Sequence, residues 1–294
     1  MAPAKVETEE PSVAVLRPAA GVRPAALVFA NPHSGRVYPA EMMAASALDA
    51  EAIRCSEDAY VDALIASAPS RGAVVVAASL ARAYIDVNRE PWELDASMFE
   101  DELPVFARAR TARVAAGLGS IARVVSEGRE IYARKLRFDE AAQRVERGHR
   151  PYHEALTSAL GEVRREHGLA ILIDWHSMPA AAAKAGLLGR ERCDFVLGDR
   201  FGGSCAPALT RLVERELESM GYLVARNAPY AGGYTTEHYG RPASGVHALQ
   251  IEINRALYVD EASLQPTEGF EPLRGELDRL FAALTGVDWR RIVG

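Results

Sequence analysis

Two histidines lie in similar short polar motifs, each directly after a run of apolar residues. His33 belongs to the motif NPHSG after the strand-like run 25–30, and His176 belongs to DWHS after the run 169–173. Polar residues that leave a buried sheet at the carboxyl ends of its strands form the active sites of open α/β folds. Either imidazole alone is equally explained as a loop histidine bonded to backbone, but their similar placement favours a role as metal ligands.

A carboxylate would complete such a metal site. Two histidines and one acid form a three-ligand zinc site whose fourth position stays open for water. The candidates are Glu57 and Asp58, which lie with Asp62 at the start of a helix predicted to follow the first loop. The same acids are also explained by the positive end of the helix dipole, so the residues alone leave the choice open.

The segment 82–89 carries a third polar group. Its alternation predicts a short strand, on which Arg82, Asp86 and Asn88 would share one face. Guanidinium groups bind carboxylates through paired hydrogen bonds, so Arg82 and Arg89 could receive an acidic substrate. Each arginine is also explained by pairing with Asp86 or another nearby acid.

A fourth group lies near the carboxyl end of the chain. Residues 232–242 are rich in glycine and aromatic residues and predict a loop that closes over a ligand. The strand predicted at 246–253 carries Glu252, which is costly to bury there unless it is paired or functional. Beside a metal-bound water, Glu252 could act as general base and then as general acid. A solvent-exposed edge strand is the competing explanation.

His149 and His153 are four residues apart on a predicted helix, a spacing that can chelate zinc. The glutamate of an HExxH motif is absent between them. We therefore interpret this pair as substrate-facing or structural.

The remaining sequence alternates apolar runs with amphipathic stretches, which predicts an α/β structure with a largely parallel or mixed sheet flanked by helices. Strands are expected at 25–30, 73–78, 169–173, 195–197, 222–225 and 246–253, and helices at 58–68, 104–126, 138–167, 206–220 and 271–284. The two long helices within 104–167 predict an inserted hairpin. Residues 1–12 are expected to form a flexible tail and residues 13–294 a single domain.

Composition narrows the class of protein. The chain has 294 residues, 49% hydrophobic and 25% charged, as in globular proteins. A net charge of −6 gives no support for nucleic-acid binding, and no apolar run approaches the length of a membrane span. Three cysteines without CxxC spacing and the absence of a signal-like start favour a reducing, cytoplasmic setting. The sequence leaves the oligomeric state open.

Taken together, these motifs resemble the N-formylglutamate amidohydrolase family, which is related in architecture to zinc carboxypeptidases and aspartoacylase-type deacylases. The matching segments follow the family's order at 31–35, 58–62, 86–89, 149–153, 174–177, 194–199 and 232–256. The resemblance implies a three-layer, phosphorylase/hydrolase-like fold with a mixed, mostly parallel sheet between helices, similar to zinc carboxypeptidases.

The resemblance also implies roles for particular residues. Zinc, or another divalent metal, would be held by His33, His176 and Asp58, although the HxxE unit of carboxypeptidases is absent because residue 36 is arginine. Glu252 and Arg82 would be catalytic. The residues that bind substrate would be Asn88, Arg89 and Arg241.

The implied activity is hydrolysis of a small N-acyl amide of an acidic amino acid, with N-formyl-L-glutamate as the leading substrate. The alternatives are a deacylase for a different N-acyl amino acid or peptide, and a non-catalytic ligand-binding protein on the same scaffold.

Overall fold

A mixed seven-stranded sheet forms the centre of the molecule, in the order β1-β3-β2-β4-β7-β5-β6. The computed structural model describes residues 11–125, 128–185 and 193–293. Within the sheet, β3, β2, β4 and β7 are parallel, β1 and β5 run antiparallel to their neighbours β3 and β7, and β6 is parallel to β5. The strands are β1 (Val13–Leu16), β2 (Leu27–Asn31), β3 (Val74–Ala78), β4 (Ala170–Met178), β5 (Phe195–Gly198), β6 (Val224–Arg226) and β7 (Val246–Asn254).

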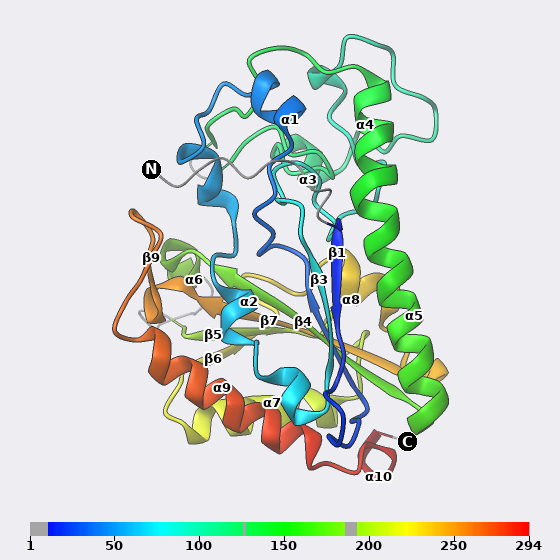
Figure 1. Cartoon of the computed structure of the whole chain (residues 1–294), viewed down its shortest axis with the longest axis vertical. Helices are drawn as coiled ribbons and strands as arrows, with labels where there is room; N and C mark the ends of the chain where they lie inside the picture. The colour runs from blue at the N-terminus through cyan, green and yellow to red at the C-terminus, as the bar shows by residue number, and fades with distance from the viewer. Residues whose placement is uncertain (1–10, 126–127, 186–192, 294) are drawn as a thin grey trace.

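Helices cover both faces of this sheet. In Figure 1, α5 runs along one side of the sheet, and α2, α7 and α9 lie on the other. The helices are α1 (Ala40–Ala45), α2 (Val61–Leu64), α3 (Ala112–Ala115), α4 (Phe138–Arg144), α5 (Arg150–His167), α6 (Ala180–Ala185), α7 (Pro207–Ser219), α8 (Tyr234–Tyr239), α9 (Phe270–Thr285) and α10 (Trp289–Val293). The small hairpin is formed by β8 (Val259–Asp260) and β9 (Gln265–Pro266).

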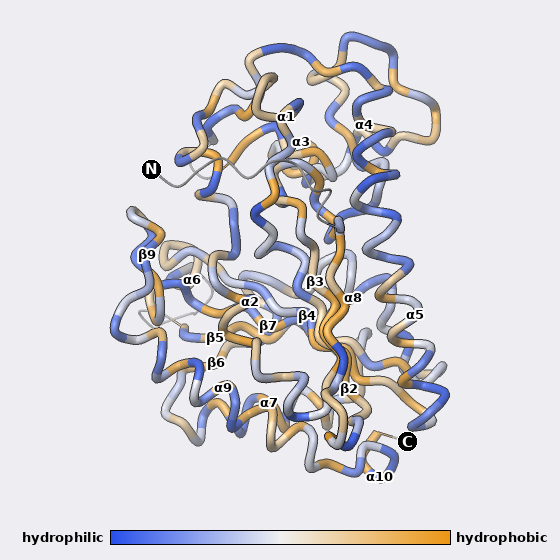
Figure 2. The backbone as a smooth tube through the Cα atoms, viewed as in Figure 1, coloured by the Kyte–Doolittle hydropathy of each residue, from blue (hydrophilic) through white to orange (hydrophobic). Residues whose placement is uncertain are grey.

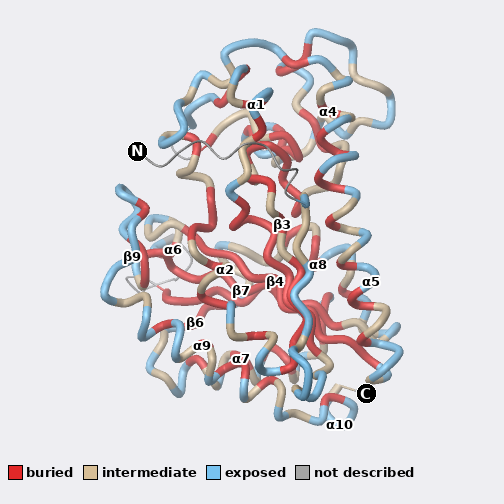
Figure 3. Tube along the Cα trace, in the orientation of Figure 1, coloured by how far each residue is buried: buried red, intermediate tan, exposed pale blue. Residues whose placement is uncertain are grey.

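Side chains alternate along each strand, so the sheet has one large hydrophobic cluster on each of its two faces. On β2, Leu27 and Phe29 face the α2, α7 and α9 side, whereas Val28 and Ala30 face the α5 side. Because both faces are covered, the central strands are buried along most of their length and are largely apolar before their carboxyl ends, as the orange stretches of Figure 2 and the red strands of Figure 3 show. The predicted α/β class, with its mixed and mostly parallel sheet between helices, is confirmed.

All six predicted strands are present, with shifted ends. The largest shift is at β4, which continues to Met178, so that His176 is part of the strand and does not follow it. The competing explanation for Glu252, a solvent-exposed edge strand, is wrong, because β7 lies between β4 and β5. The edge strand β1 was not predicted. Of the expected tail at 1–12, residues 1–10 lie outside the described residues.

The predicted strand at 82–89 is wrong. These residues form successive turns after β3 has ended at Ala78. The neighbouring strand β2 already ends at Asn31, so no ladder of backbone hydrogen bonds continues along this segment.

The predicted helix at 104–126 is also wrong, and with it the hairpin of two long helices. Within the described part of this range, residues 104–125, only Ala112–Ala115 forms an α-helix, because Gly117 adopts a left-handed conformation and Gly119 approaches the carbonyl of Glu93 too closely for any side chain. Residues 138–167 are helical as predicted, with a π-helical turn at Val145–His149 between α4 and α5. The helix expected at 58–68 is reduced to Val61–Leu64.

Within residues 11–125, 128–185 and 193–293, no helix combines the length and the apolar character that crossing a membrane requires.

An aromatic cluster between the sheet and α9 provides a test of this packing. Phe281 is fully buried, with its ring centroid 5.1 Å from that of Phe29 and 5.6 Å from that of Trp175. We expect Phe281→Ala to lower the free energy of unfolding by about 3–5 kcal/mol, because it leaves a cavity in a close-packed core. Urea denaturation of the purified protein measures the change.

The matched control is Phe201→Ala, because Phe201 is 80% exposed. This variant should remain within about 0.5 kcal/mol of the wild type. If both variants lost the same free energy of unfolding, the assignment of Phe281 to the core would be contradicted.

Candidate functional site

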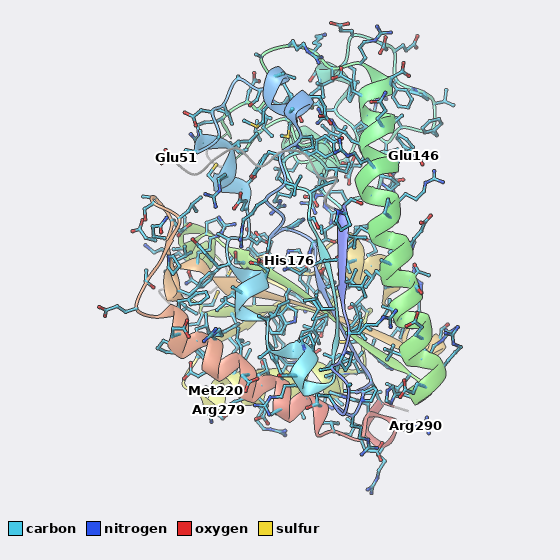
Figure 4. All side chains as sticks on the ribbon, in the orientation of Figure 1. Glu51, Glu146, His176, Met220, Arg279 and Arg290 are labelled. Carbon is cyan, nitrogen blue, oxygen red and sulfur yellow. The ribbon has the colours of Figure 1, made fainter. Side chains whose placement is uncertain are left out.

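The site lies at the carboxyl ends of the parallel strands, where the chain order reverses. From β2 the chain proceeds to β3 on one side, whereas from β4 the next parallel strand, β7, lies on the other. Such a switch point opens a crevice between neighbouring strands. His33 follows β2 and His176 lies on the adjacent β4, near the centre of the molecule in Figure 4.

Local contacts hold the loop after β2 against the loop that carries Asp58. The amide of Asp58 donates to the carbonyl of His33 at 3.0 Å, and the hydroxyl of Ser34 lies 3.0 Å from the carbonyl of Asp58. Gly35 is required because a Cβ there would lie 2.3 Å from the carbonyl oxygen of Leu80. The sequence NPHSG therefore fixes both the histidine and its neighbouring acid.

The three predicted metal ligands come together. Nδ1 of His33 and Nδ1 of His176 are 3.0 Å apart, and Oδ2 of Asp58 lies 3.3 Å from the first and 3.1 Å from the second. Tetrahedral ligands about 2.0 Å from a zinc ion would be separated by about 3.3 Å. All three residues are buried, and this group could hold a metal ion.

A second acid holds each imidazole from behind. Nε2 of His33 donates to Oδ1 of Asp86 at 2.7 Å, and Nε2 of His176 lies 3.0 Å from Oδ2 of Asp174. Metal-bound histidines almost always donate their other ring N–H in this way, which fixes the tautomer. Both rings are therefore oriented with Nδ1 available to a metal.

Glu57 and Asp58 differ in what they contact. Glu57 is fully buried but turned away, where its carboxylate accepts from the hydroxyl of Tyr38 and the guanidinium of Arg54. Asp58 directs Oδ2 to the histidines, while Oδ1 accepts from Arg255 at 3.1 Å. Of the two acids left open by the residues, Asp58 is the one beside the imidazoles.

The electrostatic environment favours a cation. Burial alone would lower the pKa of His176, but Asp174, Asp58 and Glu252 outweigh burial and raise it well above its ordinary value. Burial alone would raise the pKa of Asp58, but His176, His33 and Arg82 hold it well below its usual range. A field that favours a proton at this position would also favour a metal ion.

The formal charges around the two histidines lead to the same conclusion. Four acids face three arginines, so a divalent cation would offset the excess of negative charge. The acids are Asp58, Asp86, Asp174 and Glu252, and the arginines are Arg82, Arg89 and Arg255. One oxygen of Asp174, Oδ1, is buried without a hydrogen-bond partner. The donor set fits a divalent metal.

Glu252 lies opposite His176 in the register of β4 and β7. It is buried, and Oε1 accepts from Gln250 at 2.8 Å. Burial raises the pKa of Glu252 to about 7, although His176 opposes the shift. A carboxyl group with a pKa near neutrality can both accept and return a proton.

These groups open onto one cavity of about 690 Å³, lined by both histidines, Asp58 and Glu252. Its wall also carries five arginines: Arg82, Arg89, Arg113, Arg200 and Arg255. Arg82 donates to Asp86 at 3.0 Å. Burial lowers the pKa of Arg89. Its guanidinium comes no closer than 4.0 Å to the carboxylate of Asp86. The cavity is therefore suited to an anionic ligand.

The polar atoms of the other two predicted substrate residues contact the protein itself, although Asn88 lines the same cavity as the two histidines. Nδ2 of Asn88 lies 3.0 Å from Nε2 of His176, and Oδ1 of Asn88 accepts from the amide of Thr235, so this side chain ties α8 to the site. Arg241 lines a neighbouring cavity of about 400 Å³, together with Arg113 and Arg200, and is bonded to the carbonyls of residues 237 and 240.

Several residues of the site were not identified from the sequence. Asp174 had a signal, since it precedes His176 by two residues and therefore shares its face of the strand. Asp86 was noted only as an arginine partner. Arg255, Arg113 and Arg200 had no local signal, because only the tertiary fold brings them to the cavity.

Comparison with known proteins agrees with this geometry. A profile of the N-formylglutamate amidohydrolase family matches residues 25–259. An N-formylglutamate deformylase of Pseudomonas putida is 33% identical over 207 residues, 69% of this chain and 71% of that protein. An N-formylglutamate deformylase of Pseudomonas aeruginosa is 29% identical over 238 residues, which are 80% of this chain and 82% of that protein.

A solved structure, the N-formylglutamate amidohydrolase of Ralstonia eutropha JMP134, shares 37% identity with a TM-score of 0.89 over 96% of this chain and 99% of that one. A protein of Agrobacterium tumefaciens has the same fold at 18% identity and a TM-score of 0.66, over 95% of this chain and 96% of that one. The chain belongs to the N-formylglutamate amidohydrolase family.

Proposed function

We propose that this protein is a zinc-dependent amidohydrolase that converts N-formyl-L-glutamate to formate and L-glutamate. The observation that carries the proposal is the buried group His33, Asp58 and His176, which opens together with Glu252 onto an arginine-lined cavity. Its family and the names of its relatives support the substrate.

Zinc held by the two Nδ1 atoms and Asp58 would supply Lewis acidity and lower the pKa of water. The protein's own residues move the proton. Glu252, on the neighbouring strand β7, takes a proton from the attacking water and returns it to the departing amine. Its exchange of one proton in both directions is consistent with a pKa of about 7.

Arg82 stabilises the negative charge that develops on the acyl oxygen. Its guanidinium lies 3.5 Å from Asp58 and 3.0 Å from Asp86, so it is held beside the histidines by two buried carboxylates. A donor fixed before the reaction needs no reorganisation as charge develops, which makes such contacts effective in catalysis.

Other arginines bind the two carboxylates of the substrate. Arg89 is the candidate for one, because its guanidinium is buried and incompletely paired. Arg113 and Arg200 are candidates for the other, since both line the cavity. Arg113 lies 3.9 Å from Glu93, and Arg200 pairs at 3.1 Å with Glu237, an exposed acid that a substrate carboxylate could replace. Arg241 lines only the adjoining cavity, and we assign it no direct contact.

Replacement of the two neighbouring acids tests the metal site. We expect Asp58→Asn to lower zinc affinity by at least about 10–100-fold, because a charged ligand is lost. Glu57→Gln should keep near-wild-type affinity, because Glu57 contacts Arg54 and Tyr38. Competition with a chromophoric chelator measures both affinities. A larger loss in Glu57→Gln would assign the ligand to the other acid.

Replacement of Glu252 tests the proton transfer. We expect Glu252→Gln to lower kcat for formate release by about 10²–10⁴-fold, because the amide cannot accept a proton, while zinc remains bound. Formate release is followed with metal removed and then restored.

The control, Glu154→Gln, changes an exposed acid on α5 and should turn over normally. If the Glu252→Gln variant kept full activity, Glu252 would be excluded as the general base. If the zinc-loaded wild type hydrolyses neither N-formyl-L-glutamate nor a related acyl amide, a ligand-binding protein becomes the better explanation.

Replacement of Arg89 and Arg200 tests substrate binding. Each change to glutamine should lower kcat/KM for N-formyl-L-glutamate by about 10–100-fold, because a hydrogen-bonded charge pair with a substrate carboxylate is lost. N-formyl-L-glutamine lacks the side-chain carboxylate. Its kcat/KM should therefore fall little in one of the two variants, and that variant identifies the arginine that binds the side-chain carboxylate. Arg215→Gln, on the exposed side of α7, is the control. Equal losses for both substrates in both variants would contradict the assignment.

A further inference from the structure

The turns at 82–89 carry much of the site but have no strand ladder to hold them. Side chains take the place of that ladder by donating to the carbonyls of the segment. The four hydrogen bonds run from Tyr132 to Ala83 at 3.4 Å, Arg144 to Tyr84 at 3.3 Å, His153 to Val87 at 2.8 Å and His149 to Arg89 at 2.9 Å. The two shortest bonds, from the histidines, bracket Asn88.

Three of the four donors come from one continuous helix, and the π-helical turn at Val145–His149 determines their alignment. In an α-helix, residues three or four apart share a face, so Arg144 and His149 would point apart. Hydrogen bonding from i to i+5 adds one residue to the turn and brings these two onto the same side. His153 follows four residues later on α5.

Close packing accompanies this alignment. Gly148, within the π-helical turn, lies against Ile85, where a Cβ would be 2.6 Å from Cγ2 of Ile85. Arg144 lies over the ring of Tyr84, 4.8 Å from its centroid. The helix thus contacts the segment along its length.

Both histidines are suited to donate as neutral rings. Burial lowers the pKa of His153 to about 3, with His149 adding to the effect, and Nδ1 of His153 lies 2.8 Å from the hydroxyl of Tyr239. Burial likewise lowers the pKa of His149. The Nε2–H of each ring is therefore retained for its carbonyl.

We propose that His149 and His153 are positioning residues, which the π-helical turn aligns to hold the backbone on either side of Asn88 and so to orient Arg89 for substrate binding. Neither ring lines the cavity that contains the two metal-facing histidines; both line a separate cavity of about 560 Å³ behind the segment. They therefore act through residues 87–89. This inference rests on the proposed function for its kinetic consequence but not for its structural one.

The test compares leucine and glutamine at each position. Leucine removes the donor, whereas the amide nitrogen of glutamine can replace Nε2. We expect His149→Leu and His153→Leu to raise KM for N-formyl-L-glutamate by about tenfold, the equivalent of one hydrogen bond, with kcat within about threefold. The glutamine variants should have a KM close to that of the wild type. His167→Leu makes the same change at the far end of α5 and should match the wild type.

Hydrogen–deuterium exchange supplies a readout that needs no substrate. In the leucine variants, peptides covering residues 82–93 should exchange faster, with β2 and β4 unchanged, and the glutamine variants should lie close to wild type. Unchanged exchange in both leucine variants overturns the proposal, as does a glutamine variant that behaves like leucine.

The two proposals fail separately. Faster exchange with unaltered KM overturns the link to substrate binding. If the wild type releases no formate, the proposed function fails, while exchange still decides whether the histidines hold the segment.

Discussion

The structure of the site depends on one electrostatic constraint: two imidazole nitrogens and a carboxylate oxygen lie within 3.3 Å of one another in a buried position. Such an arrangement is costly without a cation, because the excess of acids over arginines has no solvent to screen it. The acids behind the rings, Asp86 and Asp174, increase the negative field and contact the outer nitrogen of each ring. Orientation of the rings and affinity for a cation therefore have the same source.

The surrounding backbone follows from the same requirement. Strands deliver His176 and Glu252 at fixed register, so their separation is set by the sheet itself. The residues of the site that lie on loops need other support. His33 and Asp58 are joined by a backbone hydrogen bond between their loops, and the turns with Asp86 are held by side chains from α4 and α5. Regular and irregular elements of the site are thus held in place by different kinds of contact.

Sequence patterns predicted what depends on local periodicity. Apolar runs gave the strands and the class of fold, and the paired motifs gave His33 and His176. The predictions at 82–89 and 104–126 failed because alternation and amphipathicity describe side chains, whereas these backbones are determined by partners distant in the chain, such as His153 for Val87 and Glu93 for Ser120. Arg113, Arg200 and Arg255 escaped prediction for the same reason.

The arginines of the cavity illustrate how charge can serve two purposes. Arg82 and Arg255 pair with buried acids and so reduce the repulsion among carboxylates around the histidines. Arg89 is less completely paired, and burial lowers its pKa, so a carboxylate arriving beside it would relieve a desolvated charge. In the proposed function, the affinity of Arg89 for a substrate carboxylate would therefore arise from incomplete neutralisation inside the protein. An arginine that had already found a close acid in the fold would have less to gain from the substrate.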